Sequence, residues 1–376
     1  MSHTDSASII NTIIIKIILH TYLFDEPMRN IRVMMVGSAE QSGGGVSTVL
    51  KLMKQMPFWK KYNCFWLGTQ IQRNYLWKLW YALKSNILAC FIIWRYDIIH
   101  FHTVPDRICL IIQMPVFLMS LVCRKKIVFH IHMGNQLIHH VHNSLFRWCL
   151  RHTDRVVLLA YRWKNLFDTT FADLGLHTSV IYNSNNSVSA TPSCAKERII
   201  LMAAYFNDNK APDLLLKAWQ TLHEDYPDWK VIMMGNGEVK RFETMASSLG
   251  LEDSVRFTGY VTGEERDRIW RKASIYCMCS YEEGFPMVAL EAWAYGAALV
   301  TTPVGGLPDV MEDGKNCLAY DFGDWRMLAS HIKRLIDDDN LRQAISTYAR
   351  VKSLDTFSMA KVNDSVEELY NEMINR

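Results

Sequence analysis

Residues 280–296, Ser-Tyr-Glu-Glu-Gly-Phe-Pro-Met-Val-Ala-Leu-Glu-Ala-Trp-Ala-Tyr-Gly, have the residue types of an anion-binding helix start. Pro286 suits the first turn of a helix, where its missing N–H costs nothing, and Gly296 suits the helix end. The N–H groups of Met287 and Val288 would then point out of the helix start. Unpaired amides and the partial positive charge at that end can bind a diphosphate or the hydroxyls of a sugar.

Two glutamates flank this helix start. Glu291 lies one turn into the expected helix, on the same face as Met287, and its carboxylate can accept both hydroxyls of a ribose, as an acidic residue does in dinucleotide-binding folds. Glu283, just before the turn, can reach a bound sugar. A surface helix that carries two glutamates by chance is the alternative, but the Gly-Phe-Pro turn and the small, apolar continuation argue against it.

A glycine loop, Gly43-Gly-Gly-Val46, follows an expected strand and precedes an expected helix. Glycine at Gly44 and Gly45 lets the backbone approach a phosphate closely, and the helix start adds amide donors. The loop lacks the dinucleotide-binding spacing and is not followed by Lys and Ser or Thr, which disfavours NAD binding and a P-loop ATPase. A flexible turn without a ligand is the alternative.

Two histidine pairs, His100-Phe-His102 and His130-Ile-His132, end two apolar strands. Alternation puts both members of a pair on one side of the strand, and we expect all four imidazoles at a cleft rather than in the core. An imidazole near an acceptor hydroxyl can take a proton or hold a sugar phosphate. We favour such a role for His132, whereas structural hydrogen bonding is an equal alternative for the other three. No metal-ligand spacing accompanies the histidines, so we expect no metal ion.

The elements that position these residues form two series. At 376 residues the chain exceeds the size of one hydrophobic core, so two domains are expected. Short β-branched runs alternate with longer helical stretches, which is typical of βαβ units on a parallel sheet. The expected strands are 32–36, 63–67, 97–102, 126–131, 155–159 and 179–182 in the first domain, and 198–203, 229–234, 255–258, 275–277 and 299–301 in the second.

These patterns predict five segments. They are an N-terminal extension at 1–30, a Rossmann-like domain at 31–186, a Ser/Asn-rich linker at 187–196, a second Rossmann-like domain at 197–355, and a C-terminal helix at 356–376 that packs back across the junction. Ligands of such sheets bind at the carboxyl ends of the strands. The Ile-rich run 9–24 is too interrupted for a spanning helix and lacks the features of a signal peptide. A disordered extension, a mis-assigned start and a peripheral anchor stay open for it.

The segment 283–291 resembles the double-glutamate motif of glycosyltransferase family 4, and the likeness covers nearly all of 198–350. Its further members there are Val255-Arg-Phe-Thr-Gly259, Thr302-Pro-Val-Gly-Gly306, Leu307-Pro-Asp309, Asp313-Gly314 and Asn316-Cys-Leu318. The N-terminal half matches more loosely, at the glycine loop, Asp97-Ile-Ile-His100, His132 and Ile181-Tyr-Asn183. The resemblance implies an α/β chain of the GT-B fold, with two doubly wound Rossmann-like domains facing across a cleft. It also implies a retaining transferase similar to bacterial enzymes of O-antigen, capsule and exopolysaccharide synthesis.

The resemblance also implies the roles of individual residues. Catalytic roles fall to His132, Lys210 and Glu283. Donor-binding roles fall to Gly44, Gly45, Tyr205, Lys210, Gly284, Phe285, Met287, Val288 and Glu291, and acceptor-binding roles to Gly43, His132 and Asn183. One departure concerns the diphosphate: the family usually presents an Arg and, five residues later, a Lys, but here Tyr205 precedes Lys210. Tyrosine donates one hydrogen bond and neutralises no charge, and we interpret the chain as a variant active enzyme.

Charge is distributed unevenly between the halves. Residues 1–186 carry 20 Lys and Arg against 9 Asp and Glu, whereas the remainder carries 21 against 29. Aromatic side chains beside lysines at 59–62 and 73–94 suit an anionic membrane face, although ordinary solvated charge is an equal alternative for the basic half. The apolar helix 108–122 could join this surface, but a helix buried against the sheet is the favoured interpretation. Nine cysteines, odd in number and without zinc-ligand spacing, suit a reducing cytosol.

The expected partners follow from these features. We expect a nucleotide-sugar donor, with UDP slightly favoured over GDP, a lipid-linked or oligosaccharide acceptor, and peripheral attachment to the cytoplasmic face of the inner membrane. No cofactor is expected. An epimerase or hydrolase of the same architecture and a non-catalytic sugar-binding relative are the alternatives. Nucleic-acid binding is disfavoured because the basic residues form no recognition motif.

Overall fold

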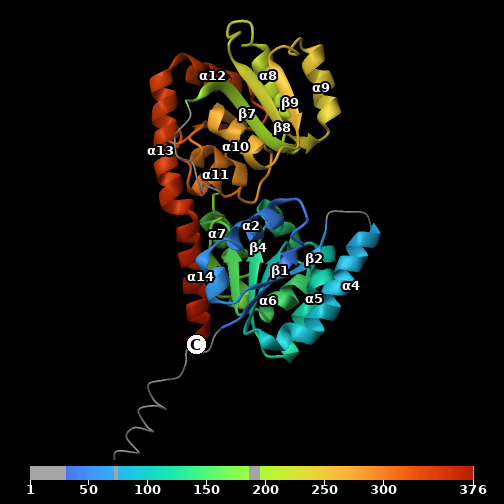
Figure 1. Cartoon of the computed structure of the whole chain (residues 1–376). Helices are drawn as coiled ribbons and strands as arrows, with labels where there is room; N and C mark the ends of the chain where they lie inside the picture. The colour runs from blue at the N-terminus through green and yellow to red at the C-terminus, as the bar shows by residue number, and fades with distance from the viewer. Residues whose placement is uncertain (1–30, 72–74, 186–194, 376) are drawn as a thin grey trace, which may run out of the picture.

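The computed structural model describes residues 31–71, 75–185 and 195–375, so the expected N-terminal extension and most of the expected linker lie outside the described residues. The chain forms two lobes, each built on a six-stranded parallel sheet (Figure 1). The first sheet has the order β2-β1-β3-β4-β5-β6, with β1 (Val33–Ser38), β2 (Phe65–Gln70), β3 (Ile98–Thr103), β4 (Lys126–Ile131), β5 (Arg155–Leu158) and β6 (Thr178–Val180). The second has the order β12-β11-β10-β7-β8-β9, with β7 (Glu197–Phe206), β8 (Lys230–Gly237), β9 (Val255–Gly259), β10 (Ala273–Met278), β11 (Ala298–Thr301) and β12 (Leu318–Ala319).

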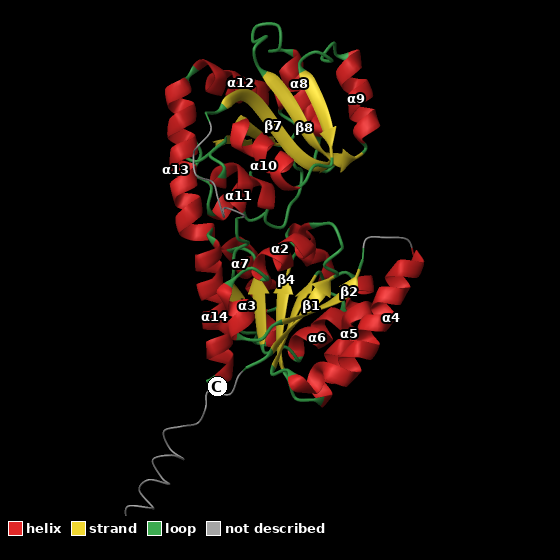
Figure 2. Ribbon diagram, in the orientation of Figure 1, coloured by secondary structure: helices red, strands yellow, loops and turns green. Residues whose placement is uncertain are grey.

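Helices surround both sheets (Figure 2). In the first lobe they are α2 (Gly45–Met53), α3 (Pro57–Lys61), α4 (Tyr75–Ile92), α5 (Arg107–Val122), α6 (Ser144–Arg151) and α7 (Tyr161–Thr170), with the 3-10 turns η1 (Ile93–Arg95), η2 (Asn135–His140) and η3 (Ala172–Leu174). In the second lobe they are α8 (Pro212–Gln220), α9 (Val239–Ser248), α10 (Gly263–Lys272), α11 (Met287–Ala294), η4 (Leu307–Asp309), α12 (Trp325–Asp337) and α13 (Asp339–Phe357).

The strands occur where the sequence predicted them. Every expected strand overlaps an observed one, because the central strands are buried on both faces and therefore consist of nearly continuous apolar runs. The prediction of two doubly wound α/β sheets is confirmed. Only β12 was missed among the described strands, since its two residues are too short to show a periodic pattern.

The last helix, α14 (Met359–Ile374), returns to the first lobe after α13 has run along the second (Figure 1). Ser358 separates the two helices and caps α14 by accepting a hydrogen bond from the Lys361 amide. Val366 and Tyr370 of α14 are buried against the apolar face of the first sheet that includes Met35. The chain terminus therefore helps to cover this sheet.

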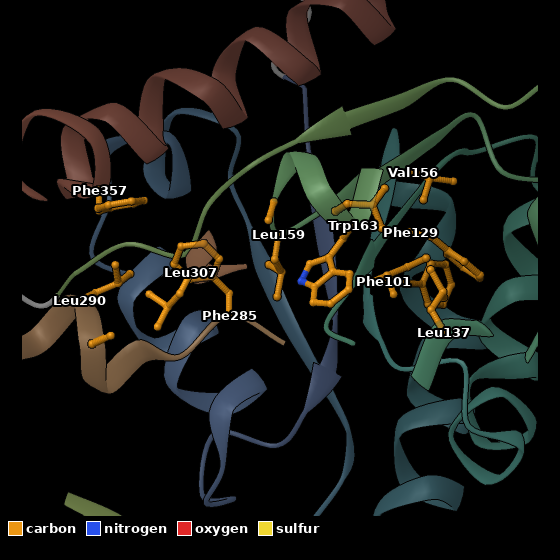
Figure 3. Close-up of a cluster of buried hydrophobic side chains, with 14 of the residues drawn as sticks. Phe101, Phe129, Leu137, Val156, Leu159, Trp163, Phe285, Leu290, Leu307 and Phe357 are labelled. Atoms are coloured by element: carbon orange, nitrogen blue, oxygen red, sulfur yellow. The ribbon is translucent and has the colours of Figure 1, made fainter. Parts of the chain in front are cut away.

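A continuous apolar core joins the lobes (Figure 3). Trp163 of α7 and Phe285, just before α11, both belong to it. The indole N–H of Trp163 donates a 2.7 Å hydrogen bond to the carbonyl of Gly284, and the ring of Phe285 packs 5.8 Å from that of Phe357 at the end of α13. The Trp163 contact holds the segment before α11 against the first lobe, and the Phe357 contact holds it against α13.

Candidate active site

A cavity of about 280 Å³ lies at the carboxyl ends of strands β7 and β10. Gly45 of the first lobe forms part of its wall, so both lobes contribute to it. The other lining residues come from the second lobe and are Met202, Ala203, Ala204, Tyr205, Lys210, Tyr276, Met278, Ser280, Glu283, Phe285, Pro286, Met287 and Val288. This edge is where parallel α/β sheets bind their ligands.

Two helix N-termini reach the cavity. Gly45 begins α2, and Met287 and Val288 begin α11. Gly44 caps α2 with φ of +98°, a conformation that favours glycine, and a side chain at Gly45 would meet no atom within 4 Å. Pro286 caps α11 rather than occupying its first turn, one position before the predicted place. The first amides of each helix lack intrahelical partners, so both helices direct donors and positive potential at an anion.

Lys210 and Glu283 form an ion pair on the cavity wall. The hydroxyl of Ser280 donates a 2.8 Å hydrogen bond to the same carboxylate oxygen. Lys210 precedes Ala211, which adopts a left-handed conformation with φ of +44° before Pro212 opens α8. Such a conformation costs an alanine about 1 kcal/mol, so the contacts of the loop must hold it. The loop thus carries the ammonium to the carboxylate.

Asn209 fixes the loop that contains Glu283. Its side-chain amide donates to the carbonyl of Glu282 at 3.0 Å, and its side-chain oxygen accepts from the Glu282 amide at 3.1 Å. Its own carbonyl accepts from the Tyr281 amide at 2.7 Å. Sequence reasoning missed Asn209 because its partner lies 73 positions away along the chain. The three bonds set the distance between the Lys210 loop and the Glu283 loop.

Three glycines let other segments approach this loop. A Cβ atom at Gly134 would lie 2.5 Å from the Glu283 carbonyl oxygen, and one at Gly306 would lie 2.3 Å from the ring of Phe285. Gly305 has φ of +65° and would place a Cβ 2.9 Å from the Gly284 carbonyl oxygen. The amide of Gly306 donates to that same oxygen at 2.9 Å. Larger residues at these positions would displace the segment before α11.

Glu291 is buried on α11 and pairs with Arg266 of α10. Burial raises the pKa of the Glu291 carboxyl, and the neighbouring guanidinium offsets part of this effect. Arg266 also contacts the Asp267 carboxylate at 3.2 Å. Glu291 is not among the residues that line the cavity, and its ribose-binding role stays a prediction. Sequence reasoning did not identify its partner Arg266.

Residues 185–352 match the family model described as glycosyl transferases group 1. This part of the chain is therefore similar to the group 1 glycosyl transferases. Over 172 residues, or 44% of this chain, the sequence is 33% identical to the D-inositol 3-phosphate glycosyltransferase of Corynebacterium jeikeium. The match covers 41% of that relative, so the chain spans less than half of its length.

Two solved structures resemble nearly the whole chain. Anabaena HepE, in complex with UDP-glucose, has a TM-score of 0.69 at 18% identity, covering 91% of this chain and 100% of that one. The lipopolysaccharide outer core galactosyltransferase WaaB has a TM-score of 0.63 at 16% identity, with the same coverage of 91% and 100%. At these identities the likeness establishes the fold. The predicted GT-B architecture is confirmed.

Tyr205 occupies an exposed position on this cavity. Its side chain is 61% exposed, and it forms part of the lining together with Lys210. Among the described residues that line the cavity, Lys210 is the one cation. Of the two cations that the family usually presents, the described cavity lining therefore contains the lysine and no second cation in place of the arginine.

The histidines are distributed differently from the expectation. His100, His102 and His130 are buried, so their predicted position at the cleft is wrong. The physical reason is that α14 covers this face of the sheet, with Tyr370 accepting from or donating to His100 Nδ1 at 2.7 Å. His132 alone is partly exposed, and burial lowers its pKa to about 4. Its imidazole is neutral near pH 7, so its catalytic role stays a prediction that requires a neutral ring.

The remaining predicted residues have mixed surroundings. Asn183 is buried and donates to the Phe285 carbonyl at 3.3 Å, so the contact it shows is a structural one and its acceptor role stays a prediction. Gly284 anchors the motif through its carbonyl, which Trp163 and Gly306 both engage. Gly43 is exposed immediately before the cap of α2. Gly43, Asn183 and Gly284 do not line the cavity, whereas Phe285, whose carbonyl Asn183 contacts, does.

An Asp-Asp-Asp run at Asp337 to Asp339 has the spacing of metal-binding Asp-x-Asp motifs, but it lies at the junction of α12 and α13. Asp337 accepts from Lys333 at 3.0 Å and Asp338 caps α13 by accepting from the Leu341 amide at 2.9 Å. These carboxylates stabilise helix ends and do not line the cavity at β7 and β10.

The outer face of α4 and α5 exposes many large apolar side chains. They are Leu76, Trp77, Leu79, Trp80, Leu83, Ile87, Leu88 and Phe91 on α4, Trp94 on η1, and Ile108, Ile111, Leu118 and Val122 on α5. The inner sides of both helices pack against β2 and each other, so the prediction of a buried helix 108–122 is right for only one face. Among the described residues, Leu76–Arg95 is the one helix long and apolar enough to cross a membrane.

The other predicted membrane-facing stretch, 59–62, is only partly exposed: Lys60 and Lys61 are exposed, whereas Trp59 is half-buried. Tyr62 is buried, and its hydroxyl donates to Asn371 of α14 at 3.1 Å. Lys61 pairs with Glu367 on the same helix. Helix α14 therefore covers Tyr62 but leaves the two lysines exposed, and a membrane contact of this stretch stays a prediction.

Proposed function

We propose that the chain is a retaining glycosyltransferase that moves a sugar from a UDP-sugar to a lipid-linked oligosaccharide at a membrane surface, in the assembly of a cell-surface polysaccharide. The observation that carries this proposal is the cavity, where two helix N-termini, Lys210 and Glu283 converge within a group 1 domain. The UDP-glucose complex of Anabaena HepE, which shares the fold, supports a uridine diphosphate donor.

In the proposed complex the diphosphate lies against the amides of Gly45, Met287 and Val288. Lys210 turns from Glu283 to a phosphate oxygen, because a doubly charged diphosphate competes well for the ammonium. Glu283 is then released to accept hydrogen bonds from the sugar. Glu291 leaves Arg266 for the ribose hydroxyls.

Transfer proceeds by positioning and electrostatics. The bond between the anomeric carbon and the diphosphate oxygen breaks, and the leaving charge is stabilised by Lys210 and the two helix starts. The acceptor hydroxyl attacks from the face that the diphosphate leaves, and a departing phosphate oxygen takes its proton. This geometry retains the anomeric configuration and uses no protein nucleophile. The neutral ring of His132 is suited to hydrogen-bond the sugar or the acceptor.

The α4–α5 face supplies the proposed membrane contact. Its apolar side chains alternate with the exposed basic residues Lys78, Lys84, Arg95, Arg107 and Arg124. Apolar and aromatic groups beside cations suit the headgroup boundary of an anionic bilayer. Because α4 packs on β2 and α5 of its own lobe, we infer that it lies on the cytoplasmic face of the inner membrane and does not cross it.

Transfer is tested by incubating the purified protein with labelled UDP-glucose, UDP-galactose, UDP-N-acetylglucosamine and GDP-mannose, with and without a bacterial lipid extract. Label entering the lipid fraction from a UDP-sugar supports the proposal. A donor converted to another nucleotide-sugar, or hydrolysed equally well without lipid, supports the epimerase or hydrolase alternative. Glu283→Gln should abolish transfer. Glu282→Gln, one position earlier and paired with Gln136, is the matched control.

Membrane attachment is tested by co-sedimentation with vesicles containing an anionic phospholipid. The double change Trp80→Glu and Phe91→Glu should release the protein from vesicles without lowering its melting temperature, since both side chains are exposed. Val351→Glu, an equally polar change at an exposed apolar position on α13, should leave binding intact. Equal binding by all three proteins would overturn this assignment of the surface.

A further inference from the structure

Four histidines form a stacked column on one face of the first sheet. His102 on β3 lies opposite His130 on β4 in the parallel register, and His100 and His132 lie two positions away along the two chain segments. Ring centroids are 4.6 Å apart both for His100 with His102 and for His130 with His132. The first three are at most 2% exposed. Burying polar rings is unfavourable unless their nitrogens find partners.

The hydrogen bonds of Tyr370 indicate which nitrogen of His100 is protonated. The Tyr370 hydroxyl donates to Sδ of Met35 at 3.8 Å, and its oxygen is then free to accept from His100 Nδ1 at 2.7 Å. His100 Nε2 consequently carries a lone pair rather than a hydrogen. That atom is buried and has no hydrogen-bond partner among the described residues.

The next histidines repeat this arrangement. Nδ1 of His102 bonds to Nε2 of His132 at 2.9 Å, which leaves His102 Nε2 as the buried atom without a partner in the described chain. Both ring nitrogens of His130 are in the same situation. Three neighbouring rings thus each present a nitrogen whose hydrogen-bonding capacity no described protein group uses.

We propose that His100, His102 and His130 bind one divalent transition-metal ion of the zinc type. One ligand nitrogen from each residue lies within 4.8 Å of the other two, and no other such group of His, Cys, Asp or Glu occurs in the part of the chain that the structure describes. Imidazole is a favoured ligand of zinc, copper and nickel ions. Metal-bound histidines normally use their second nitrogen for a hydrogen bond, which Tyr370 supplies to His100 and His132 supplies to His102.

Binding requires the rings to turn out of their stacked arrangement. Zinc–nitrogen bonds are about 2.0–2.1 Å long, so rotation of the side chains must bring the three nitrogens nearer together. His132 is the partly exposed member of the column, so the ion would enter past its ring. None of the three proposed ligands lines the donor cavity, so the ion would tie β3 to β4 below His132 and take no part in sugar transfer.

The experiment starts from full-length protein stripped of metal by a chelator and titrated with Co²⁺ and then Zn²⁺. The site predicts one ion per chain by elemental analysis, a visible Co²⁺ absorption band from nitrogen ligation, its displacement by Zn²⁺, and a higher melting temperature with Zn²⁺ because the ion binds the folded state. Failure of the wild-type protein to bind either ion would overturn the proposal, whatever the variants do.

Two variants locate the ion. His130→Phe removes two unpartnered nitrogens while keeping a ring, so the metal-free variant should fold as well as wild type but bind Co²⁺ at least about tenfold more weakly. The double change His139→Ala and His142→Ala removes exposed histidines and should bind as wild type does. An unchanged Co²⁺ band in His130→Phe, or its loss in the surface variant, would contradict the assignment.

Discussion

The ammonium of Lys210 and the carboxylate of Glu283 are paired on the wall of the proposed donor cavity, and the Ser280 hydroxyl donates to the same carboxylate oxygen. In the proposed reaction the bond between the anomeric carbon and the diphosphate oxygen breaks, and the two paired groups act on opposite sides of that bond. Lys210 then serves the diphosphate and Glu283 the sugar. Each neutralises the other until a donor supplies better partners for both.

Removing this ammonium should slow transfer strongly. Lys210→Ala is expected to lower kcat by about 10²–10³-fold, the loss typical of deleting one group that stabilises developing negative charge. Lys210→Arg should keep part of the rate. Lys217→Ala, which breaks only the pair with Asp213 on α8, is the control for losing a lysine. Steady-state kinetics with the donor identified above provide the measurement, and an unimpaired Lys210→Ala enzyme would contradict the role.

Tyr205→Arg should restore the cation that the family usually has. A second positive charge beside the diphosphate is expected to tighten UDP binding by about tenfold, which corresponds to roughly 1.4 kcal/mol, and to make binding more salt-dependent. Tyr205→Phe removes only a hydroxyl and should change affinity little. Titration calorimetry at two salt concentrations distinguishes these outcomes. Weaker binding by the arginine variant would show that Tyr205 serves the donor in another way.

Donor binding should depend on pH through Glu291. Its carboxyl must be ionised to accept two ribose hydroxyls, and burial raises its pKa. As the pH is lowered, the affinity for the donor should therefore begin to fall at a pH higher than that at which an ordinary carboxyl group is protonated. Arg266→Ala removes the group that offsets this shift, so its acid limb should lie at still higher pH. An acid limb that moves to lower pH in Arg266→Ala would contradict this account.

Trp163→Phe tests whether the contact between α7 of the first lobe and Gly284 of the second positions the segment 283–291. It deletes the hydrogen bond to the Gly284 carbonyl, which keeps its bond from the Gly306 amide. We expect a loss of about 1 kcal/mol in the free energy of unfolding, measured by urea denaturation, and a higher KM for the donor because Glu283 adjoins Gly284. Stability and KM both unchanged would mean that this contact does not position the motif.

The sequence pattern identified the strands and the residues near 283–291 because both depend on residues that are close together along the chain. Periodic apolar runs define strands, and a helix start is encoded by neighbouring residues. Asn209 and Arg266 were missed because their partners, Glu282 and Glu291, lie 73 and 25 positions away.

The histidine column was missed for a related reason. His102 and His130 become neighbours only through the register of β3 with β4, and their burial depends on α14 at the far end of the chain. No spacing along the sequence contains this information. The same helix explains why Tyr62 is buried, although the composition of 59–62 suggested a membrane contact.

The central claim is that the cavity lined by Lys210 and Glu283 binds a UDP-sugar, with Glu291 of the adjoining helix α11 binding the ribose. Calorimetric titration of wild type and Glu291→Gln with UDP and GDP tests it most directly, with Glu282→Gln as the control. We predict one UDP bound per wild-type or control chain, weaker binding of GDP, and at least about tenfold weaker UDP binding by Glu291→Gln. Absence of UDP binding to wild type, or equal affinity in Glu291→Gln, would contradict the account.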